Sequence, residues 1–587
     1  MMRLSLAERA TLFALIAKSA YRNVAHRITT HSLLRWRFAR GKTDRLVIAP
    51  QDLRTADATR ATEIYAGRFA FSGKVVVSDS RSPFEMTPPS EEWAATLLGF
   101  NWLRHLRAAD SSITRANARA LVDDWITLQG GWNVIAWRPE ILSRRILSWL
   151  CQTPLVLEEA DARFYRRFVR SLMRQVRYLR ATFKYTRDGL PRLQIAIVLT
   201  YVSLCMEGQS RWLRSSTRKL VEELNRQVLA DGGHISRNPG TLIDILLDLL
   251  PLRQAFAHRN VPPPAALNNA IDRMMPMLRF FRHGDGNFAQ FNGMGPTAVD
   301  SLATVLAYDD ARGTPVSNAP HAGYQRLECG KSVLLMDSGR PPPVALSREA
   351  NAGGLSFEFS WRTHRLVVNC GLPAIGRETW RQVARATAAH STVTFNENSS
   401  CRFVESGWVK RLLAGVPIVG GQRNVAVTRD EVETAKVVRA SHDGYARDFG
   451  IIHTRALRLS ADGRTLEGED SFAPARGEML PPNARDEFAI RFHLHPTVKA
   501  NRLQDGHGVM LLLPDREVWT FNAFEDKVEI EESVFLAGPD GPRRAVQIVI
   551  YGVARQQPTV QWSFQHTPPA QATTEKRTRR EEPELPL

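Results

Sequence analysis

The sequence contains few cysteines, and they follow no motif. The 587 residues include five of them, Cys151, Cys205, Cys329, Cys370 and Cys401. Their number is odd and no Cys-x-x-Cys pair occurs. We therefore expect free or buried thiols rather than a disulfide framework or a cysteine zinc site.

Long apolar runs are also missing. No stretch reaches the roughly 20 residues that a membrane-spanning helix needs, so no integral membrane segment is expected. The N-terminus, residues 1–28, is amphipathic and carries Glu8 before a very short apolar run. It lacks a convincing signal-peptide core and cleavage site, and we expect an ordinary first helix there.

Acidic residues are fewer than basic residues. Lys and Arg number 78 against 60 Asp and Glu, which leaves a net charge of +18. The positive electrostatic field of such a chain favours binding to polyanions, namely acidic polysaccharide, nucleic acid or an anionic membrane surface. The alternative is that the charge only keeps the protein soluble. No compact basic run lies within a recognisable nucleic-acid-binding motif, so a nucleic-acid partner is not expected.

The pattern of apolar residues divides the chain into segments. Residues 1–89 indicate a helix and a basic connector, with a short hairpin over 68–77. From 90 to 315 apolar residues recur at spacings of three and four, in helix-length segments joined by short turns. This repetition predicts a toroid of helical hairpins. Pro139 fits a helix start.

Strand patterns take over from 316 to 565. Alternating segments recur with regular turns, and Ala461-Asp462-Gly463 is a strong hairpin signal. The predicted fold class is α+β and multidomain, with an N-terminal (α/α) toroid followed by a C-terminal antiparallel β-sandwich. Residues 566–587 have no apolar periodicity and predict a disordered tail.

The stretch from Arg348 to Val393 organises the candidate site. Alternation over 355–360 predicts one strand, 366–368 a second, and a polar loop then leads to the Ala-Ala-His-Ser-Thr-Val segment. Two strands and a returning loop can bring four polar side chains together. They are Glu349, Asn351, Asn369 and His390.

This stretch resembles the C-terminal domain of the heparinase II/III-like polysaccharide lyases. In that family a His-x-His-x-Asp run precedes an "ALSF" strand, an Asp ends the next strand, and "AAHNTV" supplies another His. Segments such as AWRPEILSRRILSWL and LADGGHISRNPGTLIDILLDLL resemble family elements of the toroid, so the likeness covers about residues 90 to 560. It implies toroid plus sandwich and a place in the cell envelope or periplasm. The weak signal-peptide features leave the cytoplasm as the alternative.

Aligned on this resemblance, most of the family's chemical residues are replaced. The sandwich His corresponds to Glu349 and the toroid Tyr to Thr241. The zinc set corresponds to Asn351, Asn369 and His390, of which only His390 keeps its identity. Two amides are poor zinc ligands, so no zinc and no other cofactor is expected.

Lyases of this kind cleave uronate glycans by β-elimination, which needs a base, a group that neutralises the uronate carboxylate, and an acid. The candidates for these tasks are His234, Arg237, Asn238, Glu349, Asn351 and His390. The candidates for substrate binding are Trp137, Arg381 and Arg385, and Tyr324 is a further possible acid. Each has a structural alternative: a turn or core histidine, a surface or paired charge, or a core tryptophan.

Two functions from different classes follow. The leading hypothesis is a heparinase II/III-like lyase that acts on an acidic, uronate-containing glycan. The alternative is a non-catalytic glycan-binding or polysaccharide-assembly protein that kept the fold. A nucleic-acid-binding role rests on charge alone. The glycan and the oligomeric state are left open by the sequence.

Overall fold

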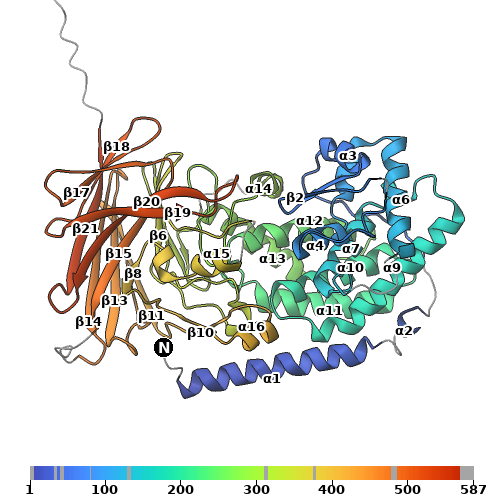
Figure 1. The fold of residues 1–587 in the computed structure, drawn as a ribbon, viewed down its shortest axis with the longest axis horizontal. Coiled ribbons are helices and arrows are strands. Elements are labelled where there is room, and N and C mark those ends of the chain that lie inside the picture. Colours follow the sequence, from blue (N-terminus) through green and yellow to red (C-terminus); the bar gives the residue numbers. More distant parts are fainter. Residues whose placement is uncertain are drawn as a thin grey trace, which may run out of the picture.

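The computed structural model describes residues 5–31, 36–39, 45–79, 81–128, 134–309, 315–374, 378–477 and 485–568. Figure 1 shows the helices gathered on one side of the molecule and the sheets on the other. The first helix lies along the outside of both. This is the predicted order of a helical toroid followed by a β-sandwich.

The helices occupy most of the first half of the chain. They are α1 (Leu6–Thr29), α2 (Trp36–Ala39), α3 (Ala58–Tyr65), α4 (Glu91–Gly99), α5 (Leu103–Ala109), α6 (Ser112–Leu128), α7 (Pro139–Cys151), α8 (Thr153–Leu157), α9 (Ala162–Thr182), α10 (Leu190–Cys205), α11 (Ser210–Gln227), α12 (Gly240–His258), α13 (Ala265–Phe280), α14 (Val299–Leu306), α15 (Glu378–Val383) and α16 (Gly407–Leu413).

Local signals in the sequence account for several helix starts. Pro139 occupies the first turn of α7, where its missing N–H costs nothing. Asp161 caps α9 by accepting from the backbone N–H groups of Arg163 and Phe164. Within the described chain, no helix has both the length and the apolarity needed to cross a membrane.

Part of the N-terminal segment packs with the toroid helices. The hairpin predicted over 68–77 is present as β1 (Arg68–Phe71) and β2 (Lys74–Val77). Phe38, Leu53 and Phe69 are buried in the same apolar core as the toroid helices. These residues therefore share the core of the toroid, whereas α1 also packs against α16.

The remaining strands form the sandwich. They are β3 (Asn318–Ala319), β4 (Tyr324–Cys329), β5 (Ser332–Asp337), β6 (Phe357–Trp361), β7 (His364–Val368), β8 (Val393–Phe395), β9 (Arg402–Phe403), β10 (Ile418–Gly420), β11 (Val425–Val432), β12 (Ala435–His442), β13 (Ile451–Ser460), β14 (Thr465–Pro474), β15 (Glu487–Leu494), β16 (Lys499–Arg502), β17 (Gly508–Leu512), β18 (Val518–Asn522), β19 (Val528–Phe535), β20 (Arg543–Val553) and β21 (Thr559–Thr567).

Two antiparallel sheets face each other across one core. Within the described residues, the first has eight strands in the order β11-β12-β13-β14-β21-β18-β17-β16. The second runs β19-β20-β15-β7-β6-β5-β4-β3, with β8 beside β15. Phe357 of the second sheet stacks on Trp562 of the first, with ring centroids 5.5 Å apart. The last strand ends at Thr567, so the first two residues of the tail predicted over 566–587 belong to β21, and residues 569–587 lie outside the described residues.

Two hairpin turns, one in each sheet, press against each other, and the turn at Gly463 is the one predicted from Ala461-Asp462-Gly463. Gly330 (φ +55°) and Gly463 (φ +72°) both adopt left-handed backbone. A Cβ at Gly330 would lie 2.2 Å from the carbonyl oxygen of Asp462, and one at Gly463 would lie 2.1 Å from that of Cys329. Only glycine satisfies both the φ angle and the close approach.

Buried polar contacts join the toroid to the sandwich. The carboxylate of Glu358, on β6, lies 3.0 Å from His283 Nε2 and accepts the backbone N–H of Gln290, both from the loop that follows α13. Arg326, on β4, donates to the carbonyl oxygens of Phe280 and Arg282. The two halves therefore meet through a specific polar interface, beside which the candidate site lies.

Candidate functional site

A cleft of about 390 Å³ lies between the toroid and the sandwich. Its toroid wall comes from residues 187–191 and 234–241, and its opposite wall from 345–350, 381–385 and 414–416. Five of the predicted site residues line it: His234, Asn238, Glu349, Arg381 and Arg385. Thus residues far apart in the sequence meet in one cavity.

We distinguish two parts of this region. The mouth comprises Arg187, Arg348, Glu349 and Arg381, whose side chains are exposed or half-buried. The floor comprises the buried residues His234, Arg237, Asp337, Asn351 and His390, some behind the cleft wall.

The mouth carries an excess of positive charge. Burial, and then the neighbouring charge of Arg187, lower the pKa of Arg348 to about 10. Arg187 Nε lies 3.7 Å from a carboxylate oxygen of Glu140, a long contact for an ion pair. Guanidinium groups whose charges repel each other are stabilised by an anion that pairs with them, and the planar group can bind a carboxylate through two hydrogen bonds.

Asp188, next to the mouth, balances part of this charge. Its carboxylate lies 3.1 Å from Lys18, 2.8 Å from both Arg22 and Arg192, and 3.5 Å from Arg226. Burial favours the neutral acid, but these cations prevail and lower the pKa of Asp188 well below its usual value. The carboxylate therefore ties α1 to the toroid wall of the cleft.

His234 is on the floor and has no free nitrogen. The backbone N–H of Ser236 donates to Nδ1 at 3.1 Å, which makes Nδ1 the acceptor. Nε2 then carries the proton and donates to Gln227 Oε1 at 3.0 Å. Burial lowers the pKa of His234 to about 3, so the ring is neutral, and its only lone pair is used inside the loop. The geometry is that of the turn histidine rather than of a base facing the cleft.

Arg237 does not reach the cleft. In a left-handed backbone conformation (φ +62°), it points into the sandwich. It donates to the carbonyls of Ala322, Arg340 and Gly323 and pairs with Asp337 at 2.6 Å. The prediction that Arg237 binds a uronate is corrected here, because its guanidinium joins the two halves of the protein.

Tyr324 belongs to the same buried network. Its hydroxyl donates to the carbonyl oxygen of Arg237 at 2.6 Å and accepts from Asn292, which also donates to Asp337. Burial raises its pKa above the usual value. Tyr324 is therefore a structural hydroxyl, not an acid within reach of a ligand.

Asn351 and His390 are brought together as predicted. Nδ1 of His390 lies 2.8 Å from the carbonyl oxygen of Ala386, to which it must donate. Nε2 is then the acceptor of the Asn351 amide, 2.9 Å away. Asn369 lies beside them and accepts the backbone N–H of Ser391 at 3.0 Å.

This donor set does not fit the zinc ion of the lyases. The His390 lone pair that would bind a metal accepts an amide N–H of Asn351 instead, and the Asn369 oxygen accepts another N–H. Neither amide offers the negative charge or the imidazole nitrogen that zinc prefers. Within the described ranges, no group of three or more His, Cys, Asp or Glu residues suits a metal ion.

The other predicted residues divide between the cleft and the core. Glu349 and Arg381 lie in the mouth, and Asn238 beside it accepts the Gly240 N–H at 2.9 Å. Arg385 lines the cleft but is 1% exposed and donates to the carbonyls of Ala350, Val416 and Ser347. Its predicted substrate contact is therefore corrected to a role in building the wall.

Trp137 lies away from the cleft. It is 2% exposed, and its ring packs edge-on against Tyr178 with centroids 5.1 Å apart. This corrects the prediction of a sugar-stacking platform. Conversely, sequence reasoning missed Arg187 and Asp188, although a charged pair before Gly189 and a new helix is typical of an exposed loop between two helices.

Comparisons with known proteins agree with this architecture. A family model described as heparinase II/III-like, C-terminal, matches residues 311–563. A relative from Caulobacter vibrioides, "FtsZ-localized protein C", is 32% identical over 533 residues, which cover 89% of this chain and 90% of the relative.

Among solved structures, "Crystal Structure of Heparinase III" is similar with a TM-score of 0.69 at 14% identity, covering 97% of this chain and 92% of that one. Heparan sulfate lyase HepC from Pedobacter heparinus gives a TM-score of 0.58 at 14% identity, covering 96% of this chain and 91% of that one. At such identities the likeness to both structures shows the fold alone.

Proposed function

Because the chain belongs to the heparinase II/III-like family, we propose that it is a member that binds an acidic glycan in its cleft without cleaving it. The observation that carries this proposal is the bonding of His234: both ring nitrogens are engaged within the protein. Thr241 replaces the tyrosine of the family resemblance, and the buried Tyr324 is bonded to a backbone carbonyl. The floor thus lacks a free base and a free acid for β-elimination.

The mouth supports the binding half of the proposal. Arg348 and Arg381 provide cations for uronate carboxylates, and Arg187 adds a third. Glu349 is exposed in the same cavity and can accept hydrogen bonds from sugar hydroxyls. This is the arrangement that an acidic polysaccharide would require of a binding cleft.

The runner-up is a lyase in which Glu349 removes the proton. It is the exposed carboxylate of the mouth, and a carboxylate can act as a base once a bound substrate excludes water from it. The arginines that bind the glycan would then also neutralise the uronate. The two functions can be distinguished by one observable, because only the lyase forms an unsaturated uronate product.

The test uses a panel of uronate-containing polysaccharides, with affinity and near-ultraviolet absorbance measured together. We expect binding to at least one member without growth of absorbance. The double variant Arg348→Ala/Arg381→Ala should bind about tenfold more weakly or worse. The matched control Arg439→Ala/Arg458→Ala, which removes exposed arginines of the first sheet, should bind like the wild type.

Two outcomes would count against the proposal. Absorbance that grows with protein concentration and is abolished in Glu349→Gln would establish the lyase instead. Absence of binding across the panel would refute the proposal that the cleft binds an acidic glycan.

The relative's name favours a second statement, about where the protein acts. We propose that this chain, like the relative with which it shares 32% identity over most of its length, localises with FtsZ. A fluorescent fusion at the C-terminus, expressed in Caulobacter vibrioides beside labelled FtsZ, should overlap with it. A signal spread evenly and independent of FtsZ would refute this placement.

A further inference from the structure

Helix α1 is apolar on two opposite sides, and the fold covers only one of them. Leu12, Leu15 and Ile16 pack against the apolar cluster of Val409 and Leu413 on and around α16. Figure 1 shows α1 running along the outer edge of the molecule, with α16 beside it and the opposite side of the helix uncovered.

The uncovered side is a continuous apolar stripe. Leu6 is 85% exposed, Phe13 72%, Tyr21 69%, Val24 56% and Ile28 62%. Their spacings place them on one face of a helix, and the exposed Ala10, Ala14 and Ala17 fill the positions between them. The stripe extends over roughly 33 Å, at 1.5 Å for each residue.

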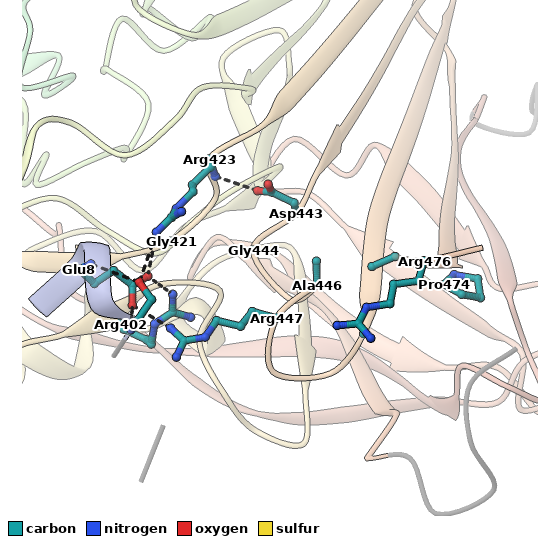
Figure 2. Close-up of a pocket in the computed structure, with 13 residues that line it drawn as sticks. Glu8, Arg402, Gly421, Arg423, Asp443, Gly444, Ala446, Arg447, Pro474 and Arg476 are labelled. Carbon is teal, nitrogen blue, oxygen red and sulfur yellow. Dashed lines mark hydrogen bonds and ion pairs between the residues drawn. The ribbon is translucent and has the colours of Figure 1, made fainter. Parts of the chain in front are cut away.

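Polar contacts hold the helix to both halves of the protein, so the stripe stays outside. At its start Glu8 forms a capping box with Ser5 and is 5% exposed. Figure 2 shows its carboxylate facing Arg402, Arg423 and Arg447. The carboxylate accepts a hydrogen bond from Arg402 and another, of 2.8 Å, from Arg447.

The toroid holds the rest of the helix. Lys18 and Arg22 pair with Asp188, and His26 Nε2 lies 3.0 Å from the hydroxyl of Tyr178. Burying the stripe by turning the helix over would break these contacts. The exposure is therefore built into the fold.

The charge around the stripe is positive. Glu8 is the sole acidic residue of α1, and its charge is neutralised by the arginines in contact with it. Arg9 and Arg27 are exposed and lie 18 residues apart, which is five helical turns, so they border the stripe on the same side. The cavity beside Glu8, of about 600 Å³, adds Arg423 and Arg476 near the start of the helix.

We propose that α1 binds an anionic lipid surface, with the stripe immersed in the interface and the arginines at the level of the headgroups. The helix runs straight along the outside of the molecule (Figure 1), and the side chains of its uncovered face are apolar and exposed. An apolar face of this kind with a cationic border is what binds an interfacial helix to anionic lipid. The proposal is independent of the cleft and of its ligand.

The experiment is co-sedimentation of the full chain with vesicles of phosphatidylcholine alone or with about a third of phosphatidylglycerol. We expect binding to the anionic vesicles that weakens as salt is raised. The triple variant Phe13→Gln/Val24→Gln/Ile28→Gln should lower the affinity about tenfold or more, and Arg9→Gln/Arg27→Gln should weaken binding to the anionic vesicles alone.

The matched control removes as many exposed apolar side chains elsewhere. The variant Ile113→Gln/Val432→Gln/Phe524→Gln changes residues that are 56%, 57% and 52% exposed, and it should bind like the wild type. All these positions are at the surface, and thermal unfolding verifies that each variant is folded.

Two results would overturn the proposal. One is equal sedimentation of the wild type and the stripe variant. The other is a wild-type dimer that the stripe variant converts to a monomer without any vesicle binding by the wild type, since the stripe would then be covered by a second copy of the chain.

Discussion

Arg237 on the floor of the cleft is buried and Arg348 at its mouth is half-buried, and the protein uses the two guanidinium groups in different ways. Arg237 donates to three carbonyls and one carboxylate across the domain junction. Arg348 lies near Arg187 and Arg22, whose charges help to lower its pKa. The donors of Arg237 are all paired with acceptors of the protein, whereas the mouth has positive charge in excess. Stability should depend on the first, and ligand binding on the second.

The largest effect is expected from Arg237→Ala. Removal of the guanidinium leaves Asp337, 3% exposed, without its ion partner and several carbonyls without a donor. Breaking a buried pair on one side costs about 3–5 kcal/mol of unfolding free energy. Denaturant unfolding measures it, with Arg348→Ala as the comparison. A loss of less than about 1 kcal/mol of unfolding free energy in Arg237→Ala would contradict the expectation that stability depends on the floor more than on the mouth.

The second effect is a pH dependence that His234 gives to stability. Its pKa is about 3 in the folded protein, against about 6.5 in the unfolded chain. The unfolded chain therefore binds more protons below pH 6.5, so stability is full above that pH and is lost as the pH falls towards 3. From pH 7 to pH 5 the loss due to this residue is about 2 kcal/mol.

The variant His234→Gln should lack this part of the slope. A similar exchange at the exposed residue His258, His258→Gln, should leave the slope unchanged. Unfolding free energies at pH 7 and pH 5 give the answer. Identical slopes for the wild type and His234→Gln would mean that the ring is accessible to protons, and hence free to act on a ligand.

A smaller effect, in binding alone, is expected at the mouth. Arg348→Ala should change the unfolding free energy by less than about 1 kcal/mol, because no partner of the side chain is left buried and unpaired. Its affinity for an acidic polysaccharide should fall about tenfold, or roughly 1.4 kcal/mol. Calorimetric titration and unfolding of the same sample measure both. A loss of stability without a loss of affinity would show that Arg348, like Arg237, stabilises the fold and does not bind the ligand.

The smallest effect is expected from zinc. The amides of Asn351 and Asn369 donate to or accept from protein groups at the positions where the lyases hold the metal. Zinc or a chelator should therefore leave the thermal midpoint of the wild type unchanged. A rise that saturates with zinc and is absent in His390→Ala would show that this part of the floor is open to a ligand.

Much of the fold was predictable because it depends on local patterns. Helical spacing, the hairpin over 68–77 and the turn at Gly463 each depend on a short stretch of sequence, and the structure contains them. Likewise, His234, Asn238 and Glu349 were predicted as site residues, and all three line the cleft.

The roles of site residues were less predictable, because they depend on partners far along the chain. Arg237 turns away from the cleft towards Asp337, 100 residues later. Trp137 is drawn into the core by Tyr178. The state of His234 depends on which of its nitrogens meets the Ser236 N–H, a matter of loop geometry that residue spacing does not reveal.

Asp188 gives the molecule a property that neither the cleft nor α1 has alone. One carboxylate is shared between Lys18 and Arg22 of the outer helix and Arg192 beside the cleft. Because Asp188 also lines the cleft, an anion that enters the mouth would lie close to this carboxylate and would change how firmly it holds the helix. By thermodynamic linkage, this effect is reciprocal. If a ligand in the cleft changes the free energy of binding through α1, then a surface bound by α1 changes the free energy of ligand binding in the cleft by the same amount.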